Sequence, residues 1–209
     1  KKKNIVLIFD ECTSGFRETY GGLHKKYKVD PDIAVFGKAL GNGYAITSII
    51  GRKKIMNCAN ETFISSTFWT ERIGFVAALK TLEVMKSKKS WKIITATGNK
   101  IRLKWKKIAS KNNLKIKIYG LPSLSRFEIL SKNWVKYKTY ITQEMLKHGF
   151  LASDSIYVSI AHTENILNRY LFKLDKIFSV IRQCEVKSQN IDDLIDNEIS
   201  KLNVTKRMN

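Results

Sequence analysis

One lysine near the start of the chain follows a short apolar run and is surrounded by glycines. Lys38 comes after residues 32–36 (Asp-Ile-Ala-Val-Phe), and glycines stand at positions 37, 41 and 43. A lysine at the end of a buried-type strand has two chemical uses: it holds a phosphate from a glycine-rich turn, or it forms a Schiff base. A phosphate-binding loop places its lysine after the glycines and before Ser or Thr. Here Ala39 follows and most of the glycines come later, so the pattern favours the Schiff base.

A second apolar run ends on a pair of carboxylates. Residues 4–9 are typical of a strand buried on both faces, and Asp10 and Glu11 follow them. In open α/β sheets the ligand-binding groups gather at the carboxyl ends of the strands. The segment up to Lys38 is long enough for a crossover between parallel strands, so we expect Asp10 and Lys38 to face one crevice. Pyridoxal phosphate (PLP) is the cofactor that requires a lysine imine and a carboxylate on its ring nitrogen.

The surrounding motifs resemble those of class III aminotransferases, in particular the glutamate-1-semialdehyde 2,1-aminomutases. The resemblance is carried by residues 9–17 (Phe-Asp-Glu-Cys-Thr-Ser-Gly-Phe-Arg), by Pro31-Asp32 and by Gly37-Lys38. It implies that Asp10 binds the pyridine nitrogen and that Lys38 forms the internal aldimine. Cys12 stands where the family usually has a valine packed against the cofactor ring.

A third site residue follows from the resemblance alone. Thr67, in the Ser-Ser-Thr-Phe segment 65–68, matches the threonine that family members give to the cofactor phosphate of the neighbouring subunit. The local pattern by itself favours a different interpretation, the start of a helix with Thr70 and Glu71 before an apolar stripe.

The same resemblance implies a fold and a function. The fold is α/β, the C-terminal part of a fold-type I PLP-dependent transferase, with a partial large-domain sheet and a small α+β C-terminal domain. The function is PLP-dependent amino-group transfer, by an aminotransferase or a 1,2-aminomutase, between a small amino donor and a carbonyl acceptor in a homodimer.

The resemblance covers about residues 4–183 and only the later part of the family pattern. We therefore expect a fragment, a split-gene product or one half of a two-chain enzyme, completed by an N-terminal half. Without further strands, Val6, Ile8, Val35 and Ile49 would face solvent or seek a partner.

A composition shift at residues 87–90 (Ser-Lys-Lys-Ser) predicts the domain boundary. We expect the C-terminal portion of the PLP-binding large domain in residues 1–90 and the small domain, with a terminal helix, in residues 91–209. Periodicity predicts a strand over 44–52, a helix over 72–86 with Ile73, Val76 and Leu79 inward, and a helix over 91–111 with a weak point at Gly98. It also predicts strands over 114–118, 125–130, 150–152 and 156–160, helices over 136–147 and after His162, and a terminal helix carrying Ile191 to Leu202.

Two residues of the later part are weaker candidates for the site. Asp154 is a candidate for the acidic residue that lies near the cofactor in the aminomutases, although its spacing differs. We interpret His162 as a capping or packing residue rather than a catalyst.

The formal net charge of +20 over 209 residues suggests a competing hypothesis from another class. It is a non-catalytic basic binding module for nucleic acid or an acidic partner. Because lysines occur along nearly every predicted helix and no nucleic-acid motif accompanies them, we favour the interpretation that the lysines lie on solvated helix faces, and we do not expect nucleic acid as a partner.

The cysteines and the apolar stretches bound the cellular setting. The spacing of Cys12, Cys58 and Cys184 fits neither a metal site nor a disulfide framework, and no apolar stretch is long enough to span a bilayer. We therefore expect a cytoplasmic protein without a metal site.

Overall fold

A computed structural model describes residues 5–67 and 70–196, and it divides the chain into two compact units. Unit 1 comprises Lys1–Thr95 and unit 2 comprises Ala96–Asn209. The division therefore lies a few residues beyond the expected boundary at 90, inside helix α4 (Ser90–Lys111). None of the helices in the described residues is long and apolar enough to cross a membrane.

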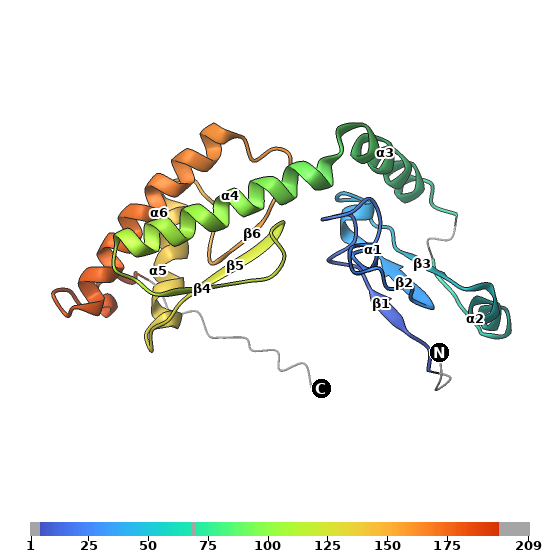
Figure 1. Cartoon of the computed structure of the whole chain (residues 1–209), viewed down its shortest axis with the longest axis horizontal. Coiled ribbons are helices and arrows are strands. Elements are labelled where there is room, and N and C mark those ends of the chain that lie inside the picture. The colour runs from blue at the N-terminus through green and yellow to red at the C-terminus, as the bar shows by residue number, and fades with distance from the viewer. Residues whose placement is uncertain (1–4, 68–69, 197–209) are drawn as a thin grey trace. The chain divides into compact units, whose positions relative to one another are not determined.

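Unit 1 is built on a three-stranded sheet in the order β1-β2-β3 (Figure 1). Strand β1 (Ile8–Asp10) pairs in parallel with β2 (Ile33–Phe36), which confirms the expected parallel arrangement. Strand β3 (Ser48–Gly51) pairs antiparallel with β2 and is shorter than the predicted strand over 44–52. The remaining elements are the helices α1 (His24–Tyr27), α2 (Lys53–Met56) and α3 (Ile73–Lys88) and the 3-10 helices η1 (Lys38–Leu40) and η2 (Asn57–Glu61).

The core of unit 1 is small, and much of its apolar surface faces solvent. The buried cluster joins β2, η1 and α3 through Ala34, Phe36, Leu40 and Ala78. The prediction that residues 4–9 are buried on both faces is wrong for the part of this segment that the structure describes, because 5–8 are exposed and Phe9 is half-buried. The prediction that Ile73, Val76 and Leu79 of α3 point inward is also wrong, because all three are exposed, whereas Leu82 of that helix packs against the buried cluster. Apolar side chains exposed on β1, β3, α3 and their flanks are Ile5, Val6, Leu7, Ile8, Ile49, Ile50, Ile73, Val76 and Leu79.

These exposed side chains have one physical cause. No described element of unit 1 covers the outer edge of β1 or the outward face of α3, so apolar periodicity predicts the elements correctly but not their burial. The expectation that Val6, Ile8 and Ile49 face solvent is confirmed, whereas Val35 is half-buried.

Unit 2 is an α+β layer with a well-filled core. Its antiparallel sheet has the order β4 (Ile116–Tyr119), β5 (Leu124–Ile129) and β6 (Ser155–Tyr157). Helices α4, α5 (Trp134–Lys147) and α6 (Glu164–Glu185) lie beside this sheet (Figure 1). Phe127 on β5 is fully buried, and its ring contacts Trp105 of α4, Trp134 of α5 and Phe178 of α6. One aromatic residue therefore contacts all three helices.

Several local predictions in unit 2 need correction. Helix α4 runs through Gly98 without a break, and a Cβ at that position would lie 1.9 Å from the Pro122 carbonyl oxygen, so only glycine allows this close approach. Residues 150–152 form no strand, and β6 covers 155–157 rather than 156–160. The predicted end of α5 before Gly149 is confirmed, with Gly149 at φ 77°. Of the predicted terminal helix, only the 3-10 turn η3 (Ile191–Leu194) is described, and Ile199 and Leu202 lie outside the described residues.

Candidate active site

The parallel pairing of β1 and β2 brings Asp10 and Lys38 to the same end of the unit 1 sheet. Asp10 is the last residue of β1 and lies opposite Val35. Lys38 begins η1 two residues after β2 ends, in a left-handed conformation with φ 46°. Its Nζ donates a hydrogen bond to Thr13 Oγ1 at 2.5 Å. The residues selected on sequence therefore lie at neighbouring strand ends, as parallel geometry requires.

Cys12 contacts Asp10 and the turn that carries Lys38. Its backbone N–H donates to Asp10 Oδ1 at 3.0 Å. A Cβ built on Gly37 would contact the Cys12 sulfur at 3.5 Å, so the thiol lies against the turn that carries Lys38. Burial and the Asp10 carboxylate raise the pKa of the Cys12 thiol, while the Lys38 amine opposes them. Through these two contacts, Cys12 links the end of β1 to the turn that carries Lys38.

Lys38 itself is exposed, and Asp10 is exposed as well. The amine of Lys38 is therefore not desolvated by the described residues. The apolar run before Lys38 lies in the sheet, but the left-handed turn directs the chain away from it. Both groups are consequently accessible to a ligand at this end of the sheet.

A buried carboxylate that the sequence reasoning did not select supports the loop after β1. Glu11 is 1% exposed, and it accepts hydrogen bonds from Ser14 Oγ at 2.5 Å and from the His24 backbone N–H at 2.9 Å. Burial alone would raise the pKa of Glu11, but the hydrogen bonds from Ser14, Leu23 and His24 outweigh it and hold that pKa below its usual value. The Glu11 backbone N–H also donates to the Val35 carbonyl at 2.8 Å, so the loop is tied to β2.

Thr67 lies away from any regular element. It is exposed and follows the irregular residues 62–66. No interaction within the described part of the chain joins it to Asp10 or Lys38. Its neighbour Phe68, which completes the predicted segment 65–68, lies outside the described residues. Its role toward a phosphate therefore stays a prediction.

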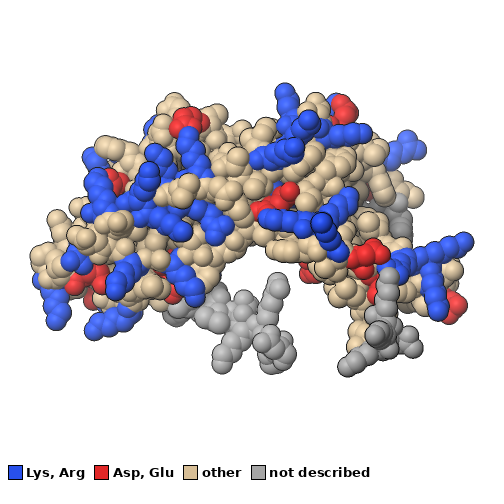
Figure 2. All heavy atoms as spheres, in the orientation of Figure 1, with Lys and Arg blue, Asp and Glu red and all other residues tan. Residues whose placement is uncertain are grey.

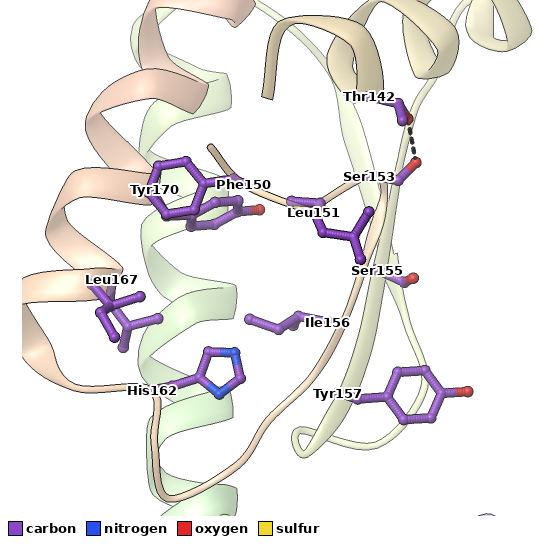
Figure 3. A pocket seen from close by; sticks show the side chains of 12 residues that line it. Thr142, Phe150, Leu151, Ser153, Ser155, Ile156, Tyr157, His162, Leu167 and Tyr170 are labelled. Atoms are coloured by element: carbon purple, nitrogen blue, oxygen red, sulfur yellow. Dashed lines mark hydrogen bonds between the residues drawn. The ribbon is translucent and has the colours of Figure 1, made fainter. Parts of the chain in front are cut away.

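The two weaker candidates, Asp154 and His162, both lie in unit 2. Asp154 is buried, and Arg126 Nε at 2.6 Å and Lys138 Nζ at 3.4 Å neutralise its charge. His162 Nδ1 accepts a hydrogen bond from the Ser159 backbone N–H at 3.0 Å, as a capping residue would. Its ring lines a half-open cavity of about 490 Å³ together with Phe150, Ile156 and Tyr170 (Figure 3).

Comparison with known families identifies the chain. The profile of the family described as Aminotransferase class-III matches residues 1–166. The chain is 35% identical over 170 residues to the 3-aminobutyryl-CoA aminotransferase of Cloacimonas acidaminovorans, a match that covers 78% of this chain and 41% of the relative. It is 27% identical over 195 residues to the glutamate-1-semialdehyde 2,1-aminomutase of Methanocaldococcus jannaschii, covering 85% of this chain and 46% of the relative. The chain belongs to the class III aminotransferase family, and it spans less than half the length of these relatives.

Solved structures support the same fold. The FumI protein of Sphingopyxis sp., described as its PLP internal aldimine form, superposes with a TM-score of 0.82 at 21% identity, covering 92% of this chain and 47% of FumI. The ornithine aminotransferase of Toxoplasma gondii superposes with a TM-score of 0.75 at 21% identity, covering 90% of this chain and 46% of that enzyme. The expected fold, part of a fold-type I transferase, is therefore confirmed.

Proposed function

We propose that this chain contributes Lys38 and Asp10 to PLP-dependent amino-group transfer, carried out by a longer or complemented aminotransferase or aminomutase. The observation that carries the proposal is the parallel β1–β2 pair, which ends in an accessible carboxylate and an accessible amine. The printed names of the relatives, an aminotransferase and an aminomutase, support the reaction class.

The residues present fit this cofactor by their chemistry. An aldehyde requires a primary amine, which Lys38 supplies, and a protonated pyridine nitrogen requires an anionic acceptor, which Asp10 supplies. Cys12 contacts Asp10 and the turn that carries Lys38, and its side chain is small enough to lie beside a flat ring. Bound there, PLP acts as an electron sink that makes a proton on the substrate carbon labile.

The residues around Lys38 then have different roles in the proposed reaction. Lys38 would hold the cofactor covalently, give way to the substrate amine, and move the proton at the substrate α carbon as a general base. Thr13 Oγ1 orients the Lys38 amine by the bond of 2.5 Å. Asp10 would keep a proton on the ring nitrogen through its negative charge. Glu11 fixes the loop that carries Cys12 and Thr13.

The finer assignments extend the same proposal. Unit 1 would be the C-terminal portion of the PLP-binding domain and unit 2 the small domain. Thr67 would hold the cofactor phosphate of a neighbouring subunit in a homodimer, and small amino donors and carbonyl acceptors would be the substrates. A cytoplasmic location suits the three cysteines, which are all free.

The test is a chimaera that restores a complete sequence. The N-terminal part of the 3-aminobutyryl-CoA aminotransferase of C. acidaminovorans would be joined to this chain and incubated with PLP. We expect a visible absorbance band from bound cofactor that is lost in Lys38→Ala and retained in the matched control Lys53→Ala. A band of equal strength in Lys38→Ala chimaera that is folded by circular dichroism would refute the role of Lys38.

A further inference from the structure

Unit 2 contains a half-open cavity that the proposed amino-group transfer does not use. Its volume of about 490 Å³ lies within the range of about 300 to 1,000 Å³ that is typical of small-molecule pockets. The cavity lies between α6, the loop after α5 and β6 (Figure 3). Most of its wall is apolar and is formed by Phe150, Leu151, Ile156, Ile166 and Leu167. Such a wall accommodates the apolar body of a small ligand.

A buried hydroxyl group in this wall has a proton to donate. Tyr170 is 6% exposed, and its hydroxyl oxygen accepts a hydrogen bond from the Trp105 indole N–H at 3.1 Å. Burial raises the pKa of Tyr170, so the hydroxyl keeps its proton at neutral pH. That proton has no acceptor among the residues that the structure describes, and Figure 3 shows the hydroxyl on the cavity side of α6. A ligand oxygen in the cavity would satisfy this buried donor.

His162 supplies a second donor. Its Nδ1 accepts a hydrogen bond from the Ser159 backbone N–H at 3.0 Å, so the neutral ring carries its proton on Nε2. Nε2 forms no hydrogen bond within the described part of the chain, and Figure 3 shows the ring pointing into the cavity. Two donors in an apolar wall favour a ligand that carries hydrogen-bond acceptors at one end.

The positive charges near the cavity favour an anionic acceptor. Helix α6 begins directly after Thr163, next to His162, and the N-terminus of a helix carries partial positive charge. The Arg169 guanidinium lies 5.8 Å from the centre of the Phe150 ring, which is part of the wall. Both features lower the free energy of a carboxylate at this end of α6.

The acidic residues nearby do not oppose an anion. Asp154 and Glu164 adjoin lining residues in sequence, but neither lines the cavity. Arg126 and Lys138 neutralise Asp154, and Lys100 pairs with Glu164 at 2.5 Å. The whole sequence has a net charge of +20, and Lys and Arg side chains cover more of the face drawn in Figure 2 than Asp and Glu do. The field of the protein therefore attracts anions rather than cations.

We propose that this cavity binds a small monocarboxylate with an aromatic body. The carboxylate oxygens accept hydrogen bonds from the Tyr170 hydroxyl and from His162 Nε2. The aromatic body packs on the apolar wall, where the Phe150 and Tyr170 rings already meet edge to face with their centres 6.1 Å apart. The proposal does not rest on amino-group transfer, because it involves only residues of unit 2.

The test is isothermal titration calorimetry of the 209-residue chain with phenylpropionate, without PLP. We expect a dissociation constant of about 0.1 to 1 mM, as is usual for a ligand of this size. Tyr170→Phe and His162→Phe each remove one donor and should weaken binding about fivefold or more. The matched control is Tyr119→Phe, which removes a hydroxyl that donates to Glu128 at 2.7 Å outside the cavity and should leave binding unchanged.

No detectable binding at about 5 mM phenylpropionate would overturn the proposal, and so would equal weakening by Tyr119→Phe. Phenylpropylamine has the same body with a positive charge and should bind about tenfold more weakly or less. Equal or tighter binding of this amine would overturn the choice of an anion.

A further variant keeps the test decisive if Tyr170→Phe fails to fold. Ala152→Phe fills the cavity from the half-buried loop after α5 without removing a hydrogen bond. It should abolish binding of phenylpropionate while circular dichroism shows a folded chain. Undiminished binding by folded Ala152→Phe would place the ligand outside this cavity and overturn the proposal.

Discussion

At the scale of residues, the neighbouring carboxylates Asp10 and Glu11 have opposite environments. Asp10 is exposed at the end of β1, whereas Glu11 is buried and receives hydrogen bonds from Ser14 and His24. Successive side chains of an extended chain point to opposite sides, so two adjacent acids do not share one task. Asp10 is thereby left for a ligand, while Glu11 holds the loop.

We predict that Glu11→Gln destabilises unit 1 in a pH-dependent way. Loss of a buried carboxylate that accepts several hydrogen bonds costs about 1.5 to 3 kcal/mol at neutral pH. Because the pKa of Glu11 is lowered in the folded protein, its contribution is complete above the unfolded pKa of about 4.3 and is lost as the pH falls through the folded value. The difference between wild type and variant in urea unfolding should therefore shrink below about pH 4.3.

The control for this measurement is Glu83→Gln, which removes an exposed carboxylate paired with Lys80 at 2.8 Å. An exposed pair of this kind contributes well under about 1 kcal/mol. If the Glu11 and Glu83 variants unfolded alike at neutral pH, Glu11 would not anchor the loop.

Sequence reasoning selected Asp10 and Lys38, which the structure places at neighbouring strand ends, but not the residues that support them. Lys38 and Asp10 stand out because a charged residue ends an apolar run. Thr13 and His24 carry no such signal, since their roles depend on the path of the loop and not on spacing. The signal that was available for Glu11 is its position directly after Asp10, which predicts that the two side chains diverge.

At the scale of elements, α4 shows how one close contact decides the place of a glycine. Helix propensity makes Gly98 a weak point of the predicted helix. The helix nevertheless continues through it, and glycine stands there because the helix passes the Pro122 carbonyl at this position, where a bulkier residue would collide with it. Such a contact between segments distant in sequence leaves no local pattern.

We predict that Gly98→Ala lowers the stability of unit 2 although alanine is the better helix former. Propensity alone would stabilise the helix by about 1 kcal/mol. The added Cβ would lie 1.9 Å from Pro122 O, and backbone has to move to accommodate it. Thermal unfolding should show a net loss of more than about 1 kcal/mol. Asn99→Ala, at an exposed position of the same helix, should be neutral or slightly stabilising, and a gain in stability for both variants would contradict the account.

Burial was predicted less well than the existence of helices and strands. The periods of α3, α4, α5 and α6 are clear in the sequence, and all four helices form. The side chains expected inward on α3 are exposed, because burial depends on which other elements are present. Short irregular stretches such as 150–152 resemble strands in composition but lack a pairing partner in the described residues.

At the scale of the whole molecule, the two units differ in how fully they bury their apolar residues. Unit 2 encloses large side chains completely, including Trp105, Tyr137, Phe127 and Phe178. Unit 1 leaves apolar residues of β1, β3 and α3 in solvent. Exposed apolar strands favour association with another chain. The exposed apolar surface of unit 1 is consistent with the finding that this chain spans less than half the length of its relatives.

We predict that the 209-residue chain alone does not hold PLP stoichiometrically. The phosphate carries about two negative charges and needs several donors. Lys38 and Asp10 supply a covalent link and one charged contact, and no interaction in the described residues joins Thr67 to them. Equilibrium dialysis should find much less than one cofactor per chain at micromolar PLP. One tightly held cofactor per chain would show that this chain carries a complete site.

The most direct test of the central claim, that β1 and β2 place Asp10 beside Lys38 as a cofactor-anchoring pair, is covalent trapping. The chain would be incubated with PLP, reduced with borohydride, and the modified lysines located by peptide mass spectrometry. Even transient binding should label Lys38 in preference to the other exposed lysines, and Asp10→Asn should remove that preference while leaving the background labelling unchanged. Labelling of Lys38 no stronger than that of Lys53 or Lys54, or a preference for Lys38 that survives Asp10→Asn, would contradict the claim.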